Sequence, residues 1–323
     1  MNQTTSTHRR GRIAALTLLT ALAPLVWGTT YAVTSEMLPA GHPLFAGTLR
    51  ALPAGLIAVA IGTALPSGSW WWKSATLGIL NIGLFFPMLF IAAERLPGGV
   101  AGTLGSVSPL IVALIAVPLL GDRLSVWRVG WGVAGVVGVG LVVLGPAAKL
   151  DIVGIVAGLV GAGSMALGVT LTKRWGRPQG VNSVALVGWQ LTAGGLFLVP
   201  VTLMIEGAPP AIDARAALGY AWLGLAGGLI AYVVFFSGVG KLPLSSVAPL
   251  SLLSPLMAAT LGVTVLGESL SAPQIAGLAV ALASVLAGQI SPPRLLRQTP
   301  HSATQLAPAP SPITYPIPSQ LAR

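Results

Sequence analysis

Long apolar segments follow one another along most of this chain and are separated by short loops. A helix needs roughly 20 apolar residues to cross a hydrocarbon layer of about 30 Å. Segments exposed to lipid must satisfy their own backbone hydrogen bonds, which favours helices. The sequence therefore predicts an all-α integral membrane fold with ten transmembrane helices, over residues 13–35, 43–65, 74–93, 98–120, 127–146, 152–172, 182–205, 216–239, 244–266 and 273–290.

The composition excludes several other classes of protein. Only 7% of the 323 residues are charged, whereas a soluble domain carries about 25%. The chain has no cysteine, and its three histidines, His8, His42 and His301, are scattered. We therefore expect no metal and no cofactor. The net charge of +10 comes from basic residues dispersed between apolar segments, so the expected partner is the lipid bilayer and not nucleic acid.

The distribution of Lys and Arg predicts the orientation in the membrane. If the N-terminus is cytoplasmic, only Arg95, Lys149 and Arg215 of the 17 basic residues fall outside. Arg50 lies within a predicted span, and the others fall on the cytoplasmic side. Because cytoplasmic loops are enriched in Lys and Arg, we expect a multi-pass protein of the inner (plasma) membrane with both termini in the cytoplasm.

Two terminal segments lie outside the predicted spans. Residues 1–12 form a short N-terminal segment that is expected to be cytoplasmic. Residues 291–323 contain eight prolines among Ser, Thr and Gln. Such a composition cannot bury enough apolar surface to fold, so this segment is predicted to be a disordered, Pro-rich cytoplasmic tail.

Three short motifs recur at one constant offset of 146 residues. The motif at 95–97 recurs at 241–243, Ser-Pro-Leu at 108–110 recurs at 254–256, and the Gly-Asp motif at 121–125 recurs as Gly-Glu at 267–271. The recurrence predicts two related halves, 13–146 and 147–290, with five transmembrane helices each. An alternative is a duplicated scaffold that has no transport function.

An odd number of helices in each half has a topological consequence. The second half must enter the membrane upside down relative to the first. Inverted repeats place a substrate site near the midplane between the repeats and allow alternating access. We therefore expect the two halves to be related as inverted repeats.

Several of these motifs resemble the EamA family of the drug/metabolite transporter superfamily. They are Trp27-Gly28 in the first predicted helix, Pro43 and Arg50 in the second, and Ser-Pro-Leu followed by Gly-Asp/Glu-x-Leu-Ser in the fourth and ninth. One departure is Met165, which stands near the position in the second half that corresponds to Trp27. The resemblance covers residues 13–290 and implies export or exchange of amino acids or similar small metabolites, with no enzymatic step.

Arg50 is the most distinctive candidate for substrate binding. It lies about 10 Å along the helix axis from the start of its predicted span. A charge at that depth costs about 2.5–3.5 kcal/mol on insertion scales, so it normally faces a cavity or a partner. A guanidinium donates two parallel hydrogen bonds to a carboxylate. Arg50 is therefore predicted to bind a substrate carboxylate, with snorkelling to the outer surface as the alternative.

Pro109 and Pro255 occupy equivalent positions of the two repeats. A proline inside a helix removes one backbone hydrogen bond and kinks the helix. We predict that these two prolines act as kinks or gates, and that Ser108 and Ser254 before them contact substrate. Kinks that only shape helix packing are the alternative.

Few other polar residues occur within the spans. Asn81 and Gln190 can bind substrate or can hold helices together. The aromatic residues that we expect to wall a substrate pocket are Trp27, Tyr31, Phe85, Phe86, Trp189 and Tyr232.

The seven acidic residues all fall at the ends of predicted spans or in loops. No carboxylate in mid-membrane is therefore available to carry protons or sodium. The leading interpretation is an inner-membrane exporter of amino acids or related metabolites. Import or exchange, and a non-transporting receptor or assembly partner, are the alternatives. The sequence indicates no oligomeric state.

Overall fold

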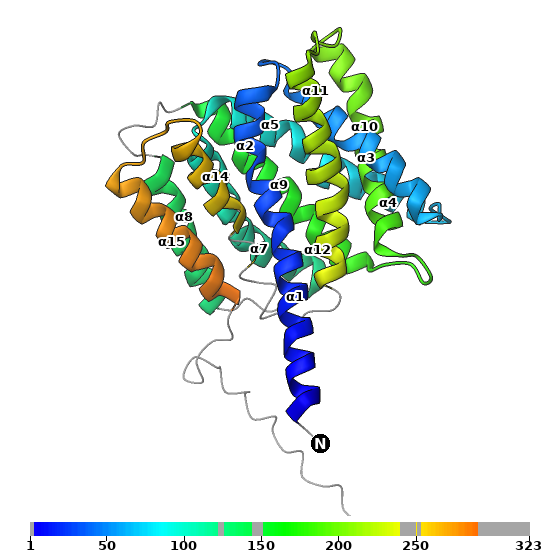
Figure 1. The fold of residues 1–323 in the computed structure, drawn as a ribbon, viewed down its shortest axis with the longest axis horizontal. Coiled ribbons are helices and arrows are strands. Elements are labelled where there is room, and N and C mark those ends of the chain that lie inside the picture. Colours follow the sequence, from blue (N-terminus) through cyan, green and yellow to red (C-terminus); the bar gives the residue numbers. More distant parts are fainter. Residues whose placement is uncertain (1–2, 122–125, 144–150, 240–249, 251–252, 290–323) are drawn as a thin grey trace, which may run out of the picture. The chain divides into compact units, whose positions relative to one another are not determined.

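The computed structural model describes residues 3–121, 126–143, 151–239, 250 and 253–289. Every regular element within these residues is a helix (Figure 1). An all-helical membrane fold is therefore in agreement with the sequence prediction. The predicted tail, the loop at 122–125 and the first part of the predicted span 244–266 lie outside the described residues.

Seven helical segments of the described chain are long and apolar enough to cross a membrane. They are Ala15–Met37, Pro43–Gly62, Trp70–Arg95, Gly98–Leu120, Ile152–Trp175, Ser183–Ile205 and Ala214–Phe235. Three shorter apolar helices, Val126–Val142, Leu253–Thr264 and Ala272–Gly288, lie at the remaining predicted spans. Ten membrane crossings stay a prediction.

Several of the long segments are composed of more than one helix. In chain order the elements are α1 (Gln3–Gly28), α2 (Thr30–Met37), α3 (Pro43–Gly62), α4 (Trp70–Gly78), η1 (Ile79–Leu84), α5 (Phe85–Arg95), α6 (Gly98–Leu104), η2 (Gly105–Val107), α7 (Ser108–Leu120), α8 (Val126–Val143), α9 (Ile152–Trp175), α10 (Ser183–Ile205), α11 (Ala214–Ala221), η3 (Trp222–Ile230), α12 (Ala231–Val239), α14 (Leu253–Thr264) and α15 (Ala272–Gln289).

Two of the interruptions are π-helical and were not predicted from the sequence. The π-helix η1 joins α4 to α5, and the π-helix η3 joins α11 to α12. The offset of 146 residues maps η1 onto the second part of η3. A π-helical turn disturbs the regular i to i−4 hydrogen bonds and often marks a functional position. The offset thus places the two π-helices at related positions, one in the third helical segment of each half.

Side chains from the opposite half bind carbonyl groups of both π-helices. The Ser164 hydroxyl of α9 donates to the Leu80 carbonyl of η1 over 2.7 Å. The Trp27 indole of α1 donates to the Gly227 carbonyl of η3 over 2.9 Å. Each bond joins the first long segment of one half to the third segment of the other.

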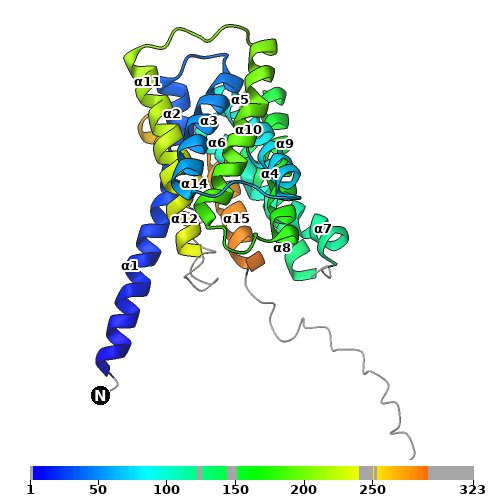
Figure 2. The same cartoon turned by 90° about the vertical axis from the view of Figure 1, so that its right-hand side faces the viewer.

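The helices pack in pairs that relate the two halves. The most extensive contacts are between α3 and α10 and between α8 and α15, which lie side by side in Figures 1 and 2. Helix α1 contacts α12 and α14, and α9 contacts α5 and α7 in the same manner. The contacts of α1 in the first half thus correspond to those of α9 in the second half.

Most of the charged side chains that the structure describes lie at one of two ends of the helices, whereas Arg50 is buried within α3. The acidic end contains Glu36, Glu94, Asp151, Glu206, Asp213 and Glu268, which are all of the described acidic residues, together with Arg95 and Arg215. The basic end contains Lys73, Arg128, Lys173, Arg174 and Arg177.

Glycines allow the backbones of α3 and α10 to approach closely. A Cβ added at Gly195 would lie 2.7 Å from the Leu52 Cβ and 2.9 Å from the Leu52 nitrogen. In α9, by contrast, a Cβ added at Gly163 would have no neighbour within 4 Å. Small residues at helix interfaces are the usual means of close packing in membranes.

We predict opposite effects when alanine replaces these two helical glycines. Gly195→Ala should lower the apparent melting temperature of the detergent-solubilised protein, because overpacking against a backbone costs about 1–3 kcal/mol. Gly163→Ala should leave it unchanged or raise it, because alanine favours a helix by about 0.5–1 kcal/mol over glycine. Equal melting temperatures for the two variants would contradict the α3–α10 packing.

Candidate functional site

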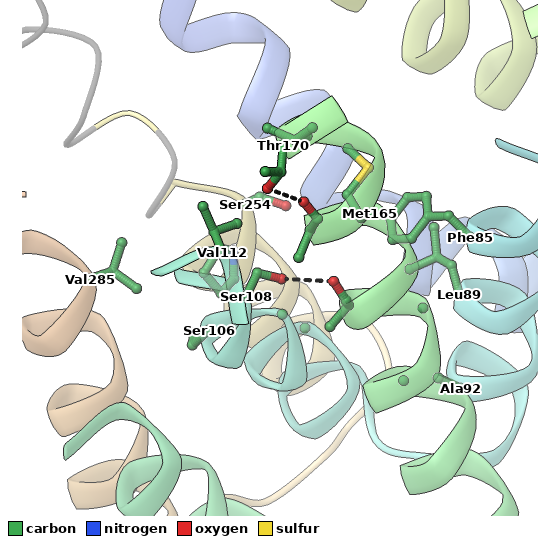
Figure 3. Close-up of a pocket in the computed structure, with 18 of the residues that line it drawn as sticks. Phe85, Leu89, Ala92, Ser106, Ser108, Val112, Met165, Thr170, Ser254 and Val285 are labelled. Carbon is green, nitrogen blue, oxygen red and sulfur yellow. Dashed lines mark hydrogen bonds between the residues drawn. The ribbon is translucent and has the colours of Figure 1, made fainter. Parts of the chain in front are cut away.

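A cavity of about 810 Å³ lies between helices of both halves (Figure 3). Most of its walls come from α5, α7 and α9, with shorter contributions from α2, α6, η2, α8, α14 and α15. Apolar side chains such as Phe85, Leu89, Val112, Met165 and Val285 make up most of the lining. Cavities of 300–1,000 Å³ with such linings are typical of small-molecule sites.

A few hydroxyl groups interrupt the apolar lining. The Ser108 hydroxyl donates to the Ala162 carbonyl over 3.4 Å, and the Thr170 hydroxyl donates to the Ala166 carbonyl over 2.8 Å (Figure 3). Ser254, on α14, also lines the cavity. Because a hydroxyl carries one proton, Ser108 and Thr170 keep lone pairs that can accept hydrogen bonds from a ligand.

The charged residues in the described lining are both basic. Arg128 of α8 and Lys173 of α9 line the cavity toward the basic end. Their positions show that the cavity reaches this end of the helices. The described acidic residues are absent from the lining.

Toward the acidic end, α6 and α14 are in close contact. A Cβ added at Gly102 would lie 3.0 Å from the Ala258 Cβ, and one at Gly99 would lie 3.5 Å from the Ala259 Cβ. The Glu268 carboxylate also accepts a hydrogen bond from the Gly98 backbone N–H over 2.7 Å. A carboxylate at the start of a helix is stabilised by the free N–H groups and by the helix dipole.

Further polar contacts join helices at the acidic end. Glu206 accepts hydrogen bonds from the Leu44 and Phe45 N–H groups, over 2.7 and 2.8 Å, at the start of α3. Ion pairs join Arg95 to Asp151 over 3.0 Å and Arg215 to Glu36 over 2.8 Å. Together with the α6–α14 contact, these interactions join the helices to one another at the acidic end.

Asp151 illustrates how these contacts stabilise charge. It is the N-cap of α9 and accepts a hydrogen bond from the Gly154 N–H over 2.8 Å. This backbone hydrogen bond and the adjacent Arg95 guanidinium lower the pKa of the Asp151 carboxyl below its usual value. The carboxylate therefore stays ionised at neutral pH.

Arg50 is buried and does not line the cavity. Its guanidinium lies 4.6 Å from the centre of the Phe86 ring and 5.9 Å from that of Phe90. One terminal nitrogen donates to the Thr30 hydroxyl over 3.3 Å, whereas the Nε has no hydrogen-bond partner. Arg50 interacts electrostatically with Tyr31, whose ring lines the cavity. The guanidinium is thus outside the cavity lining, whereas Tyr31, with which it interacts, is part of that lining.

The other predicted site residues fall into three groups. Tyr31, Phe85, Ser108, Ser254 and Pro255 line the cavity. Trp27 and Tyr232 stack edge to face, with ring centres 5.2 Å apart. Trp27 donates a hydrogen bond to the carbonyl of Gly227, which lies next to the Arg50 guanidinium, and Tyr232 interacts electrostatically with Arg50. Asn81, Gln190 and Trp189 lie outside the lining.

The residues outside the lining join helices together. Asn81 donates to the Gln190 side chain over 2.8 Å, between η1 and α10. The Trp189 indole donates to the Ala64 carbonyl over 2.7 Å near the basic end. Pro109 lies in the first turn of α7, directly after the 3₁₀ turn η2. The predicted continuous helix over 98–120 is therefore interrupted just before this proline.

Sequence reasoning missed most of the apolar lining. Leu89, Val112 and Met165 are surrounded in sequence by other apolar residues, so no periodic pattern separates a cavity face from a lipid face. It also missed the Arg50 partners Thr30 and Phe90. The basic pair Arg128 and Lys173 was visible only as part of the charge bias toward the cytoplasm.

The chain is similar to known transporters along most of its length. Residues 15–144 and 152–287 each match the EamA-like transporter family. Protein PecM of Dickeya dadantii (strain 3937) is 44% identical over 256 residues, which cover 79% of this chain and 86% of PecM. The uncharacterized transporter YvbV of Bacillus subtilis (strain 168) is 28% identical over 277 residues, which cover 83% of this chain and 89% of YvbV.

A solved structure also shares the fold. One protein crystal structure aligns with 85% of this chain and 95% of its own, with a TM-score of 0.59 and 21% sequence identity. The family match covers most of the chain and agrees with its apolar helices and its cavity. The chain therefore belongs to the EamA-like transporter family of the drug/metabolite transporter superfamily, and it is a membrane transporter and not an enzyme.

Proposed function

We propose that this transporter exports amino acids or related small metabolites across the inner membrane by alternating access between two inverted repeats. The observation that carries this proposal is the cavity between helices of both halves. It reaches the basic end, and at the acidic end α6 and α14 are in contact, which in this proposal closes the path on that side. Such a one-sided cavity is what an alternating-access transporter presents in one of its two states.

The symmetric arrangement of the two halves supports the inverted repeat. The family matches the chain twice, at 15–144 and 152–287. The π-helices η1 and η3 occupy related positions, and the helix neighbours of the first half correspond to those of the second. A pseudo-symmetric pair of halves can exchange roles, which produces two related conformations.

The charge distribution supports the direction. Basic residues gather at the end that the cavity reaches, and the positive-inside rule assigns that end to the cytoplasm. In this conformation the cavity faces the cytoplasm and can load a substrate for export. The same geometry can also serve exchange, which is favoured over proton coupling because the described acidic residues do not line the cavity.

Arg50 is proposed to join the path when the outer end opens. Its Nε is buried without a partner, and an unsatisfied buried donor costs about 1–3 kcal/mol. A substrate carboxylate that passes Tyr31 would supply the missing acceptor. The Arg50 interaction would thus be made in transit, after loading from the cavity.

Removal of the Arg50 side chain is predicted to reduce export strongly. In cells that overproduce the protein, the wild type should accumulate one or more metabolites outside the cell, relative to an empty vector. Arg50→Ala at matched protein levels should lower this accumulation roughly tenfold or more, because a charged hydrogen bond is worth about 1.5–3 kcal/mol. Mass spectrometry of the medium and of the cells measures the metabolite concentrations outside and inside for each strain.

Arg177→Ala is the control, because Arg177 is exposed and bonds only locally to Ser183. It should export like the wild type. If no metabolite separates the wild type from the empty vector in a broad panel, export is contradicted. If Arg50→Ala exports normally, Arg50 is not part of the path.

A disulfide across the closed end should stop transport. The chain has no cysteine, and the Cβ positions of residues 99 and 259 lie 3.5 Å apart, within the disulfide range of about 3.5–4.5 Å. Oxidised Gly99→Cys/Ala259→Cys should lose the export seen with the wild type, and dithiothreitol should restore it. Each single variant should remain active. Undiminished export with the disulfide fully formed would show that α6 and α14 need not separate.

A further inference from the structure

We infer that a site for the ammonium group of an exported amino acid lies at the acidic end, formed by the Glu94 and Glu206 carboxylates and the Tyr220 hydroxyl. Glu94 belongs to α5, Glu206 directly follows α10, and Tyr220 belongs to α11. These three helices all contact α3. The inference rests on the proposed export and deepens it, because it assigns a place outside the cavity where a substrate binds on its way out.

The Tyr220 hydroxyl is a buried polar group that has no hydrogen-bond partner among the described residues. Tyr220 is 6% exposed. Its ring packs edge to face on Phe45, with ring centres 5.7 Å apart, and the Phe45 N–H donates to Glu206. The hydroxyl interacts electrostatically with both Glu206 and Glu94. Because a buried hydroxyl without a partner is unfavourable, this group is suited to gain a partner when a ligand reaches the two carboxylates.

The two carboxylates carry negative charge that their surroundings balance only in part. Glu206 accepts the Leu44 and Phe45 N–H groups, and Glu94 accepts the Gly41 N–H over 3.3 Å. Neither carboxylate forms an ion pair within the described chain. The start of a helix is worth about half a positive charge, whereas two carboxylates carry two negative charges. A bound cation would therefore be stabilised between them.

The basic groups nearest to Glu94 have other acceptors. Arg95 and His42 both interact electrostatically with Glu94. However, Arg95 is paired with Asp151 over 3.0 Å, and the His42 Nδ1 lies 3.0 Å from the Ala40 carbonyl oxygen. Neither group thus takes the place of a cation between the two carboxylates.

The chemistry of the site favours an ammonium group over a metal ion. The described residues contain no group of three or more His, Cys, Asp or Glu side chains that could hold a metal. An ammonium group carries three N–H donors, and Glu94, Glu206 and Tyr220 offer one oxygen acceptor for each. Hydrogen bonds from an ammonium to carboxylates are among the stronger ones in proteins.

The site lies on the acidic side of Arg50. Glu94 follows Phe90 by one helical turn of α5, and the Phe90 ring centre lies 5.9 Å from the Arg50 guanidinium. Phe86, Phe90 and Tyr220 belong to one cluster of buried side chains. A zwitterion that leaves Arg50 toward the acidic end would therefore meet the two carboxylates and the phenol next.

The test compares amino acids with analogues that lack only the ammonium group. Each member of a panel of amino acids is paired with the 2-hydroxy acid of the same side chain, which keeps the carboxylate and nearly the same size. The mixture is loaded into liposomes that contain the purified full chain, and mass spectrometry times the release of each compound. Protein-free liposomes give the leak. The wild type should release at least one amino acid about tenfold faster than its hydroxy analogue.

Tyr220→Phe is the most informative variant, because it removes only the hydroxyl. It should shrink the preference for the amino acid several-fold, whereas its melting temperature should stay the same or rise, since the hydroxyl has no partner in this state. Glu94→Gln should shrink the preference in the same way. Glu36→Gln is the matched control, because it removes a carboxylate of the same end that is paired with Arg215. It should retain the preference.

The outcomes separate the two proposals. Equal release of an amino acid and its hydroxy analogue would overturn the ammonium site and leave the export function standing. A preference that persists in both Tyr220→Phe and Glu94→Gln would overturn the assignment to these side chains. Release that requires sodium in place of choline, with both forms treated alike, would assign the site to an inorganic cation and overturn the inference. Release of no compound above the leak would contradict both this inference and the proposed export.

Discussion

Among the contacts between the two halves, two hydrogen bonds run from a side chain of one half to a π-helical carbonyl of the other, within the apolar interior. A carbonyl that lacks a hydrogen-bond partner is costly where water is excluded, and each of these bonds supplies a donor to a carbonyl of η1 or η3. Ser164 satisfies one from α9, and Trp27 satisfies the other from α1. Because each donor comes from the opposite half, each π-helical interruption is also a point at which a helix of the other half is attached. The cavity lies beside these junctions, with Tyr31 and Phe85 on its wall.

The two ends of the helices differ in how their residues pack. At the acidic end, glycines of α6 allow contact with α14, and Glu268 binds the first N–H of α6. The 3₁₀ turn η2 separates α6 from α7. Ser108, directly after η2, and Ser254 of α14 line the cavity, which reaches the basic end. Small residues and caps thus make one end of the helices compact, while larger apolar side chains line the space at the other.

The sequence predicts the all-helical membrane fold because hydropathy measures the property that a bilayer selects. Four of the residues that were proposed from the sequence to contact substrate line one cavity, namely Tyr31, Phe85, Ser108 and Ser254. The sequence could not predict that Asn81 and Gln190 bind each other, since a polar residue in a membrane helix bonds equally well to a neighbour or to a ligand. The π-helices and the apolar lining were also beyond prediction, because both depend on which helices meet and not on local composition.

The central claim is that the cavity faces the cytoplasm while the acidic end faces outward. Single cysteines test it directly in a chain that has none. Val169→Cys lies in the cavity lining, and Ile212→Cys lies between α10 and α11 at the acidic end. A membrane-impermeant maleimide should modify Ile212→Cys in intact cells and Val169→Cys only in inside-out vesicles. Modification of Val169→Cys in intact cells, or of both residues from the same side, would contradict the account.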